Sequence, residues 1–188
     1  MKTRKSKTHR INRKHAALIV IDIQERLLPA IFDKEKVMEN TLRLIKGSNI
    51  LGLPVFVTEQ YRKGLGQTVA GVAEQVSPFV AVEKLAFSAC GAAGFKPALK
   101  RKNIFDVILC GIESHVCISQ TCLDFLDGGS RVFVVADAVS SRTVENHRIA
   151  IERMRDAGAT MVSTEMILFE LLQEAGTAEF KQILALVK

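Results

Sequence analysis

Residues 16–22 read AALIVID, an apolar run rich in β-branched residues that ends in one acid. Such a run predicts a strand buried on both faces, as in a parallel sheet. Five further runs of the same character are bounded by turn signals, and we expect strands there too: Pro54–Thr58, Val80–Glu83, Ile104–Cys110, Arg131–Ala136 and Ala159–Val162. Six buried strands therefore form the predicted core.

Stretches of helical character lie between these strands. In Lys34–Leu51 the apolar residues recur at helical spacing, and Gly52 and Pro54 follow as a stop signal. Further helices are predicted at Ser114–Leu126, Val144–Ala157 and Glu165–Glu174, with a short one from Ala178. The alternation of strand and helix predicts an α/β fold: a doubly wound sheet of about six parallel strands, helices on both faces, and one domain over residues 16–188.

The composition is that of a globular chain. Of its 188 residues, 48% are hydrophobic and 24% are charged, which excludes a largely disordered protein. Four cysteines without a regular spacing are too few for a disulfide scaffold, so we expect reduced thiols in a cytoplasmic protein. No apolar run approaches about 20 residues, and no standard secretion signal follows the basic start. Neither a membrane span nor a membrane partner is predicted.

The net charge of +6 comes from one end of the chain. Residues 1–15 hold seven Lys and Arg and no acid, whereas the other 173 residues hold 19 Lys and Arg against 20 Asp and Glu. A basic arm can touch nucleic acid or anionic lipid, but this one has no aromatic residue to stack on a base. We expect residues 1–15 to be a solvated, disordered extension without specific nucleic-acid binding, and a transit peptide is the weaker alternative. Deleting residues 1–14 should then leave folding intact.

Three chemically capable side chains are predicted at one edge of the sheet. Ligands of doubly wound sheets bind beyond the carboxyl ends of the strands. Asp22 ends the first strand, Lys84 ends the third, and Cys117 lies in the first turn of the helix after the fourth. The helix dipole and an ammonium favour a thiolate, and a carboxylate can carry the thiol proton to a leaving group. Each residue alone also has a purely structural explanation. Asp22 could cap the following turn, Lys84 could be a solvated charge, and Cys117 could be a small buried hydrophobic residue.

The chain resembles the isochorismatase-like cysteine hydrolases. The fragments that carry the resemblance are LIVIDIQERLLPAI, TEQYRKGLGQT, EKLAFSAC, GIESHVCISQTCLDFL and VVADAVSSR. The match runs from about Ala16 to Leu172 and is strongest for the metal-free branch of isochorismatase domain-containing proteins. It implies a parallel sheet of strand order 3-2-1-4-5-6 and a homo-oligomer, because members commonly form dimers or larger assemblies.

The resemblance also implies roles for individual residues. The family's Asp–Lys–Cys triad falls on Asp22, Lys84 and Cys117. A cis peptide bond is implied at Ile112–Glu113, with the backbone N–H groups of Glu113 and Cys117 as a candidate oxyanion hole. The implied function is hydrolysis of a small amide or related carbonyl compound through a thioester acyl-enzyme.

Two departures from the family pattern narrow this function. Nicotinamidases bind a metal through an Asp-x-His cluster after the second strand, where this chain has Thr58-Glu59-Gln60-Tyr61 and no His between His15 and His115. We therefore expect no metal and no other cofactor, and nicotinamide is a doubtful substrate. The isochorismatases that cleave a vinyl ether lack the nucleophilic Cys, which this chain has.

Other residues near the same sheet edge complete the predicted site. We expect five side chains to contact or orient the small-molecule substrate: Gln24, Gln60, Tyr61, Phe87 and His115. Cys90, in a Gly/Ala-rich loop after Lys84, is an alternative nucleophile or redox partner. A dyad of His115 with Cys117 is disfavoured, because side chains two residues apart on a helix point to opposite sides.

A fold of this kind is compatible with three function classes, and the sequence excludes one of them. The first is the cysteine hydrolase, and the second is a catalytically idle binding or scaffolding protein, which an intact triad does not exclude. A redox or dinucleotide-binding domain is excluded, because the chain lacks CxxC and has no third glycine beside Gly64 and Gly66.

The C-terminal region gives a physical argument for self-association. Apolar residues lie on more than one face of Glu165–Glu174, which predicts an exposed patch around Phe169 and Leu172 that a homo-oligomer would cover. The alternative is that the last helix folds back over this patch and leaves a monomer.

Overall fold

The computed structural model describes residues 10–188 and contains a six-stranded sheet. The strands are β1 (Ala16–Ile21), β2 (Val55–Gln60), β3 (Ala81–Lys84), β4 (Asp106–Ile112), β5 (Arg131–Ser140) and β6 (Thr160–Val162). They run parallel in the order β3-β2-β1-β4-β5-β6. The predicted fold class and strand order are confirmed, although β4 starts later than expected and β5 ends later.

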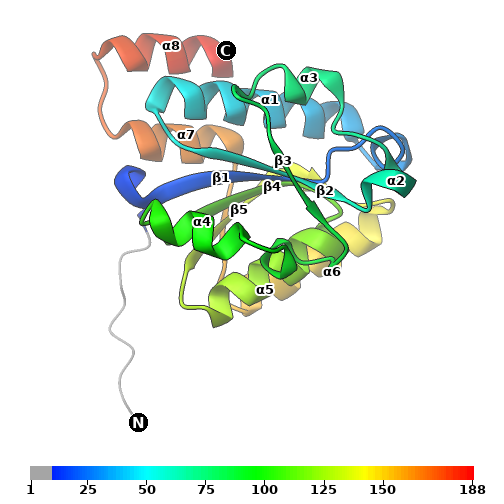
Figure 1. Ribbon diagram of the computed structural model, residues 1–188. Coiled ribbons are helices and arrows are strands. Elements are labelled where there is room, and N and C mark those ends of the chain that lie inside the picture. Colours follow the sequence, from blue (N-terminus) through cyan, green and yellow to red (C-terminus); the bar gives the residue numbers. More distant parts are fainter. Residues whose placement is uncertain (1–9) are drawn as a thin grey trace.

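Helices cover both faces of the sheet (Figure 1). They are α1 (Lys34–Leu51), α2 (Arg62–Leu65), α3 (Ala70–Ala73), α4 (Phe95–Arg101), α5 (Ser119–Asp127), α6 (Val144–Asp156), α7 (Thr164–Leu172) and α8 (Ala178–Val187). The helices α1, α7 and α8 lie on one face, and α4, α5 and α6 lie on the other. A π-helical turn, η4 (Ser114–Ile118), precedes α5 where one continuous helix was expected. Within residues 10–188, no helix is long and apolar enough to cross a membrane.

The strand β1 lies at the centre of the sheet, and every one of its residues is buried. Leu18 and Val20 point into the core under α1 and α7. Ala17, Ile19 and Ile21 point into the opposite core, with α4 and α5. Because both faces of the strand are covered, both sets of alternating positions must be apolar. This explains why the run that begins at Ala16 is continuous rather than alternating.

Gly111 lets the end of β4 approach β1 closely. Its φ angle is +110°, a backbone conformation that residues with a Cβ rarely adopt. A Cβ atom on Gly111 would lie 2.1 Å from the carbonyl oxygen of Ile21 and 2.7 Å from its nitrogen. The register between β4 and β5 also shifts between Leu109 and Gly111. The chain therefore leaves β4 by a path that only glycine permits, and this path leads into η4.

The segment at residues 10–15 is packed onto the fold, which contradicts the predicted disordered extension there. Ile11 is 4% exposed and belongs to the core under α1 and α7. Its backbone nitrogen donates to Glu170 Oε1 at 2.7 Å, and that of Asn12 donates to Asp106 Oδ2 at 2.8 Å. Arg13 makes two hydrogen bonds to the Glu179 carboxylate, at 2.7 and 2.9 Å. The folded domain therefore includes residues 10–15, so deleting residues 1–14 is expected to destabilise it, contrary to the sequence prediction. Residues 1–9 of the predicted extension lie outside the described residues.

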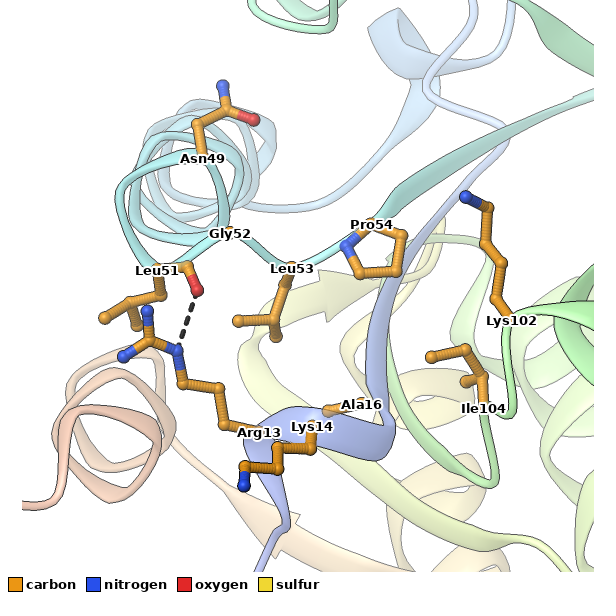
Figure 2. Close-up of a pocket in the computed structure, with 10 residues that line it drawn as sticks. All are labelled: Arg13, Lys14, Ala16, Asn49, Leu51, Gly52, Leu53, Pro54, Lys102 and Ile104. Atoms are coloured by element: carbon orange, nitrogen blue, oxygen red, sulfur yellow. Dashed lines mark hydrogen bonds between the residues drawn. The ribbon is translucent and has the colours of Figure 1, made fainter.

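A hollow of about 920 Å³ lies at the amino ends of the central strands. Figure 2 shows the residues that line it. Arg13 crosses one side of it and donates from Nε to the carbonyl oxygen of Leu51 at 2.7 Å. Lys14, Pro54 and Lys102 also line it. The hollow lies at the edge opposite the carboxyl ends of the strands, where chemistry is expected in a sheet of this kind.

Replacing Ile11 with alanine is expected to lower the free energy of unfolding by about 2–4 kcal/mol, because it leaves a cavity in the core. The matched control is Ile149→Ala on α6, where the side chain is 48% exposed; its cost should be about 0.5 kcal/mol. Urea denaturation of the full-length variants measures both values. Equal, small losses would show that residues 10–15 contribute little to folding.

The C-terminal helices cover one another. Leu172 is 6% exposed within the core, and the Phe169 ring lies 6.5 Å from the Phe180 ring of α8. The helix α8 also packs on α1. The patch expected around Phe169 and Leu172 is therefore absent from the described chain, because α8 folds back over α7. The homo-oligomer stays a prediction that rests on the resemblance alone.

Candidate active site

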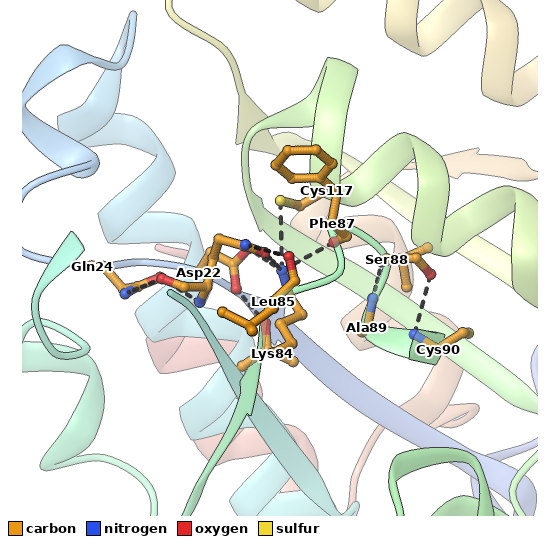
Figure 3. A network of polar contacts seen from close by, with 12 residues as sticks. Asp22, Gln24, Lys84, Leu85, Phe87, Ser88, Ala89, Cys90 and Cys117 are labelled. Carbon is orange, nitrogen blue, oxygen red and sulfur yellow. Dashed lines mark hydrogen bonds and ion pairs between the residues drawn. The ribbon is translucent and has the colours of Figure 1, made fainter. Parts of the chain in front are cut away.

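Three elements bring Asp22, Lys84 and Cys117 together at the carboxyl edge of the sheet (Figure 3). Asp22 follows β1, Lys84 ends β3, and Cys117 lies in η4. The Nζ atom of Lys84 donates to Asp22 Oδ2 at 2.7 Å and lies 3.6 Å from Cys117 Sγ. All three residues are at least nine-tenths buried. The residues expected from the strand ends thus form one cluster in the fold.

Lys84 is the centre of this cluster. Besides Asp22 and Cys117, its ammonium faces Gln60 Oε1 at 2.8 Å and the Phe87 carbonyl oxygen at 3.0 Å. The side chain has no exposed surface. An ammonium buried without partners would be strongly destabilising, and here a carboxylate neutralises it while oxygen acceptors surround it. Lys84 is therefore fixed in position and orients both of the groups that it joins.

Asp22 is held by a second side chain that the sequence did not identify. The Thr58 hydroxyl donates to Asp22 Oδ1 at 2.6 Å. Thr58 is fully buried on β2, where its neighbour across the ladder is Ile21. Asp22 itself adopts a left-handed backbone conformation, with a φ of +52°. The only signal in the sequence is a hydroxyl residue near the end of the strand beside β1.

The two predicted glutamines lie behind the cluster. Gln24 is fully buried; its amide nitrogen donates to the carbonyl oxygens of Gln60 and Gly66, and its oxygen accepts from the Gln60 nitrogen. These bonds use its amide within the fold, and its predicted role toward the substrate stays a prediction. Gln60 binds Lys84 with its side-chain oxygen and donates from its side-chain nitrogen to the Leu85 carbonyl at 2.9 Å. Gln60 thus positions the lysine and the end of its strand, and Gln24 holds Gln60 in place.

Two aromatic side chains stand at the surface beside the cluster. Phe87 is 52% exposed, and its carbonyl oxygen accepts from Lys84 Nζ. Tyr61 is 51% exposed and lines a hollow of about 310 Å³ together with Lys84 and Leu85. These positions leave both rings free to meet a small molecule, so their contact with substrate stays a prediction.

The Cys117 thiol differs from the expected thiolate. Burial, reinforced by the negative charge of Asp22 and opposed by the positive charge of Lys84, raises the pKa of Cys117 to about 12. The resting thiol is therefore protonated at neutral pH, contrary to the expectation from the helix start and the ammonium. Desolvation is the largest cause, and it outweighs the opposing charge of Lys84. A carboxylate next to a protonated thiol is arranged to accept its proton.

The turn before Cys117 is fixed at several points. The peptide bond between Ile112 and Glu113 is cis. The Glu113 carbonyl oxygen accepts hydrogen bonds from the nitrogens of Val116 and Ile118, both at 3.1 Å. The Glu113 carboxylate accepts from the Arg142 guanidinium at 2.9 Å. These bonds hold the main chain of η4 in one conformation.

His115 and Cys90 stand apart from the triad. The Nδ1 atom of His115 lies 2.9 Å from Ser141 Oγ, so this imidazole is bonded toward the segment after β5. Its predicted contact with substrate stays a prediction. In Figure 3 the segment Phe87–Ala89 lies between Cys117 and Cys90. Burial raises the pKa of the Cys90 thiol to about 11, and the Lys84 ammonium does not contact it.

The segment that binds metal in nicotinamidases has another use in this chain. Glu59 is 1% exposed, and its Oε1 accepts from the nitrogen and the hydroxyl of Thr68 at 2.7 and 2.8 Å. Its Oε2 lies 3.4 Å from Arg62 Nε. Within residues 10–188, no group of three or more His, Cys, Asp and Glu is arranged to hold a metal ion. Glu59 instead anchors the loop that follows β2, and metal independence stays a prediction.

Sequence comparison identifies relatives of nearly full length. The isochorismatase domain model matches residues 16–166. The secreted isochorismatase effector Isc1 of Phytophthora sojae is 40% identical over 182 residues, which cover 92% of this chain and 84% of the effector. Isochorismatase domain-containing protein 2 of Danio rerio is 38% identical, over 93% and 87% of the two chains.

Solved structures show the same fold. MAR1 ribonuclease from Caenorhabditis elegans superposes with a TM-score of 0.89 at 37% identity, over 95% of this chain and 92% of that one. YcaC from Pseudomonas aeruginosa, solved with hexane-2,5-diol and covalent acrylamide, gives a TM-score of 0.87 at 25% identity, over 94% and 91%.

Proposed function

This chain belongs to the isochorismatase family, and from that premise we propose that it is a cysteine hydrolase of small amides or related carbonyl compounds. The observation that carries the proposal is the Lys84 ammonium, which joins a carboxylate and a thiol inside a buried site. The family accounts for a hydrolase. The three side chains supply a base, an orienting cation and a nucleophile.

The proposed reaction uses the thiol in two steps. The Cys117 sulfur attacks the carbonyl carbon while its proton passes to Asp22, and Asp22 then gives that proton to the leaving amine as the C–N bond breaks. Water next attacks the thioester and loses a proton to Asp22, which returns it to the departing sulfur. The products are a carboxylic acid and an amine, and the free thiol is restored.

Backbone N–H groups are the proposed stabilisers of the oxyanion. The Glu113 nitrogen donates no hydrogen bond to any residue in the described part of the chain, although Glu113 is buried. A free N–H in a rigid turn is suited to receive a developing negative charge. The Cys117 N–H, four residues further along η4, is the proposed second donor.

Acrylamide is the probe that tests this assignment, because YcaC from P. aeruginosa holds it covalently. We expect mass spectrometry to find Cys117 modified before Cys90 when the protein is treated at neutral pH. Cys117 is 5% exposed, whereas Cys90 is the more exposed thiol, so simple access would give the opposite order. Acetamide should protect Cys117. Earlier modification of Cys90 would contradict the assignment.

Turnover separates the hydrolase from an idle binding protein of the same fold. A screen over amides, carbamates and nitriles tests the proposed substrate class, and an RNA oligonucleotide belongs in it because a relative is called a ribonuclease. Acrylamide labelling of Cys117 without turnover of any compound would favour the binding protein. Activity that vanished with chelator and returned with zinc would contradict metal independence.

Replacing Asp22 with asparagine is expected to lower turnover at least about 100-fold, because it removes the base. Acrylamide modification of the variant should then rise about tenfold per pH unit from pH 7 to 9, as the thiolate population does below its pKa. The wild-type slope should be shallower, because Asp22 accepts the proton. Asp124→Asn, which removes an exposed carboxylate on α5, is the control and should leave both quantities unchanged. Equal slopes in all three proteins would contradict the role of Asp22.

A further inference from the structure

A second polar cluster lies between η4 and α6, and the triad does not use it. His115 Nδ1 lies 2.9 Å from Ser141 Oγ, and Ser141 Oγ is hydrogen-bonded to Ser114 Oγ. Ser114 Oγ in turn lies 3.3 Å from His147 Nδ1 on α6. The four side chains thus form one row, with an imidazole at each end and two hydroxyl groups between them. Ser141 Oγ also accepts a hydrogen bond from the His115 backbone nitrogen at 3.3 Å.

The burial of this row differs along its length. Ser114 and Ser141 have no exposed surface, whereas His115 and His147 are half-buried. The two hydroxyl hydrogens must therefore find their acceptors within the row, whereas the imidazoles are partly exposed at its ends. The row differs from a fully buried hydrogen-bond network, because solvent can reach the imidazole at each end but not the two hydroxyl groups between them.

Counting hydrogen atoms fixes the state of the two imidazoles. The row has three links, and two hydroxyl groups supply one hydrogen atom each. The third must come from an imidazole, so one Nδ1 carries hydrogen and the other accepts. If both Nδ1 atoms donated, one buried hydroxyl would be left without an acceptor, at a cost of about 1–3 kcal/mol. The favoured arrangements therefore hold one Nδ1–H.

We propose that His115, Ser141, Ser114 and His147 form a proton relay that links the turn carrying Cys117 to the surface over α6. A proton that arrives at Nε2 of one imidazole moves each hydrogen in the row by one link. The other imidazole then releases its own Nε2 proton. No proton is gained or lost, and the direction of the row is reversed. In either direction the Nε2 atom of one imidazole carries hydrogen and that of the other can accept it. The tautomer of His147 therefore sets the tautomer of His115.

The charged groups around the row leave it able to work near neutrality. Burial and the positive charge of Lys36 on α1 lower the pKa of His147. Lys36 itself lies 4.0 Å from Asp33. On the side of η4, the Glu113 carboxylate is paired with Arg142. His147 is thus neutral at physiological pH, as a relay requires.

The tautomers of the imidazoles test the relay without any substrate, so a failure of the hydrolase proposal leaves this test intact. In full-length protein labelled with ¹⁵N-histidine, at a pH where both imidazoles are neutral, NMR should find Nδ1–H on one of His115 and His147. In Ser141→Ala neither should carry it, because both then favour Nε2–H. Signals are assigned with His115→Gln and His147→Gln.

Two controls show whether a change is specific. Ser119→Ala removes a buried hydroxyl that has no partner within residues 10–188 and should leave both tautomers as they are. His15, whose Nδ1 lies 3.0 Å from the Asn103 carbonyl oxygen, should keep its signals in every variant and so report a folded protein. The relay would be overturned if both imidazoles carried Nε2–H in the wild type. It would also be overturned if the tautomers of His115 and His147 were unchanged in Ser141→Ala.

Discussion

Cys117→Ala is expected to reduce kcat/KM by at least about a thousandfold on any substrate that the protein turns over, because a covalent route cannot proceed without its nucleophile. The loss should appear in kcat, since Phe87 and Tyr61 remain available to bind the substrate. Steady-state kinetics measures the loss of turnover, and intact-mass spectrometry detects the acyl-enzyme. In the wild type the acyl group should map to Cys117.

The control for this variant is Cys90→Ala. Cys90 is the alternative thiol near the same edge, and removing it should change kcat/KM by less than about twofold. A comparable loss in Cys90→Ala would move the chemistry to that residue. Undiminished turnover in Cys117→Ala would remove the thioester route altogether and leave a hydrolase that activates water directly.

Gly111→Ala is expected to lower the free energy of unfolding by at least about 4 kcal/mol, which is exceptional for a single substitution. The added Cβ would lie 2.1 Å from the Ile21 carbonyl oxygen, so the backbone of one of two central strands must move. The φ angle of +110° adds strain that glycine does not have. Urea denaturation, or the yield of soluble protein if the variant does not fold, measures the effect.

Gly52→Ala separates crowding from backbone strain. Gly52 ends α1 with a φ of +68°, and apart from its own neighbours along the chain nothing lies within 4 Å of the place where its Cβ would be. Its replacement should therefore cost only the about 1–2 kcal/mol of a left-handed alanine. If Gly111→Ala cost no more than Gly52→Ala, the close approach of β4 to β1 would not constrain the fold.

The sequence predicted those features that depend on local pattern. The run from Ala16 gave the central strand because both faces of β1 are covered, and α1 was predicted to the residue because helical spacing ends at a clear stop. Asp22, Lys84 and Cys117 were found because parallel strands deliver their carboxyl ends to one edge. Each of these inferences needs only the chain itself and the rule for the sheet.

Features that depend on contacts between distant segments were missed. Thr58 faces Asp22 only because of the register of β2 against β1, and Ser141 meets His115 only because β5 runs further than expected. The raised pKa of Cys117 reflects burial, which a position at a helix start does not reveal. Ile11 gave a single apolar signal in a basic stretch, too weak to predict that residues 10–15 are packed.

The charge of the buried triad favours one direction for the proposed reaction. The carboxylate of Asp22 and the ammonium of Lys84 cancel, and the thiol of Cys117 is protonated, so the resting site carries no net charge. An uncharged amide can enter without a counter-ion. The acid that leaves becomes a carboxylate beside Asp22, where no unpaired cation of the triad awaits it. Electrostatic repulsion from Asp22 therefore favours release of the carboxylate product. Carboxylates of the same shape as the substrate should be weak inhibitors.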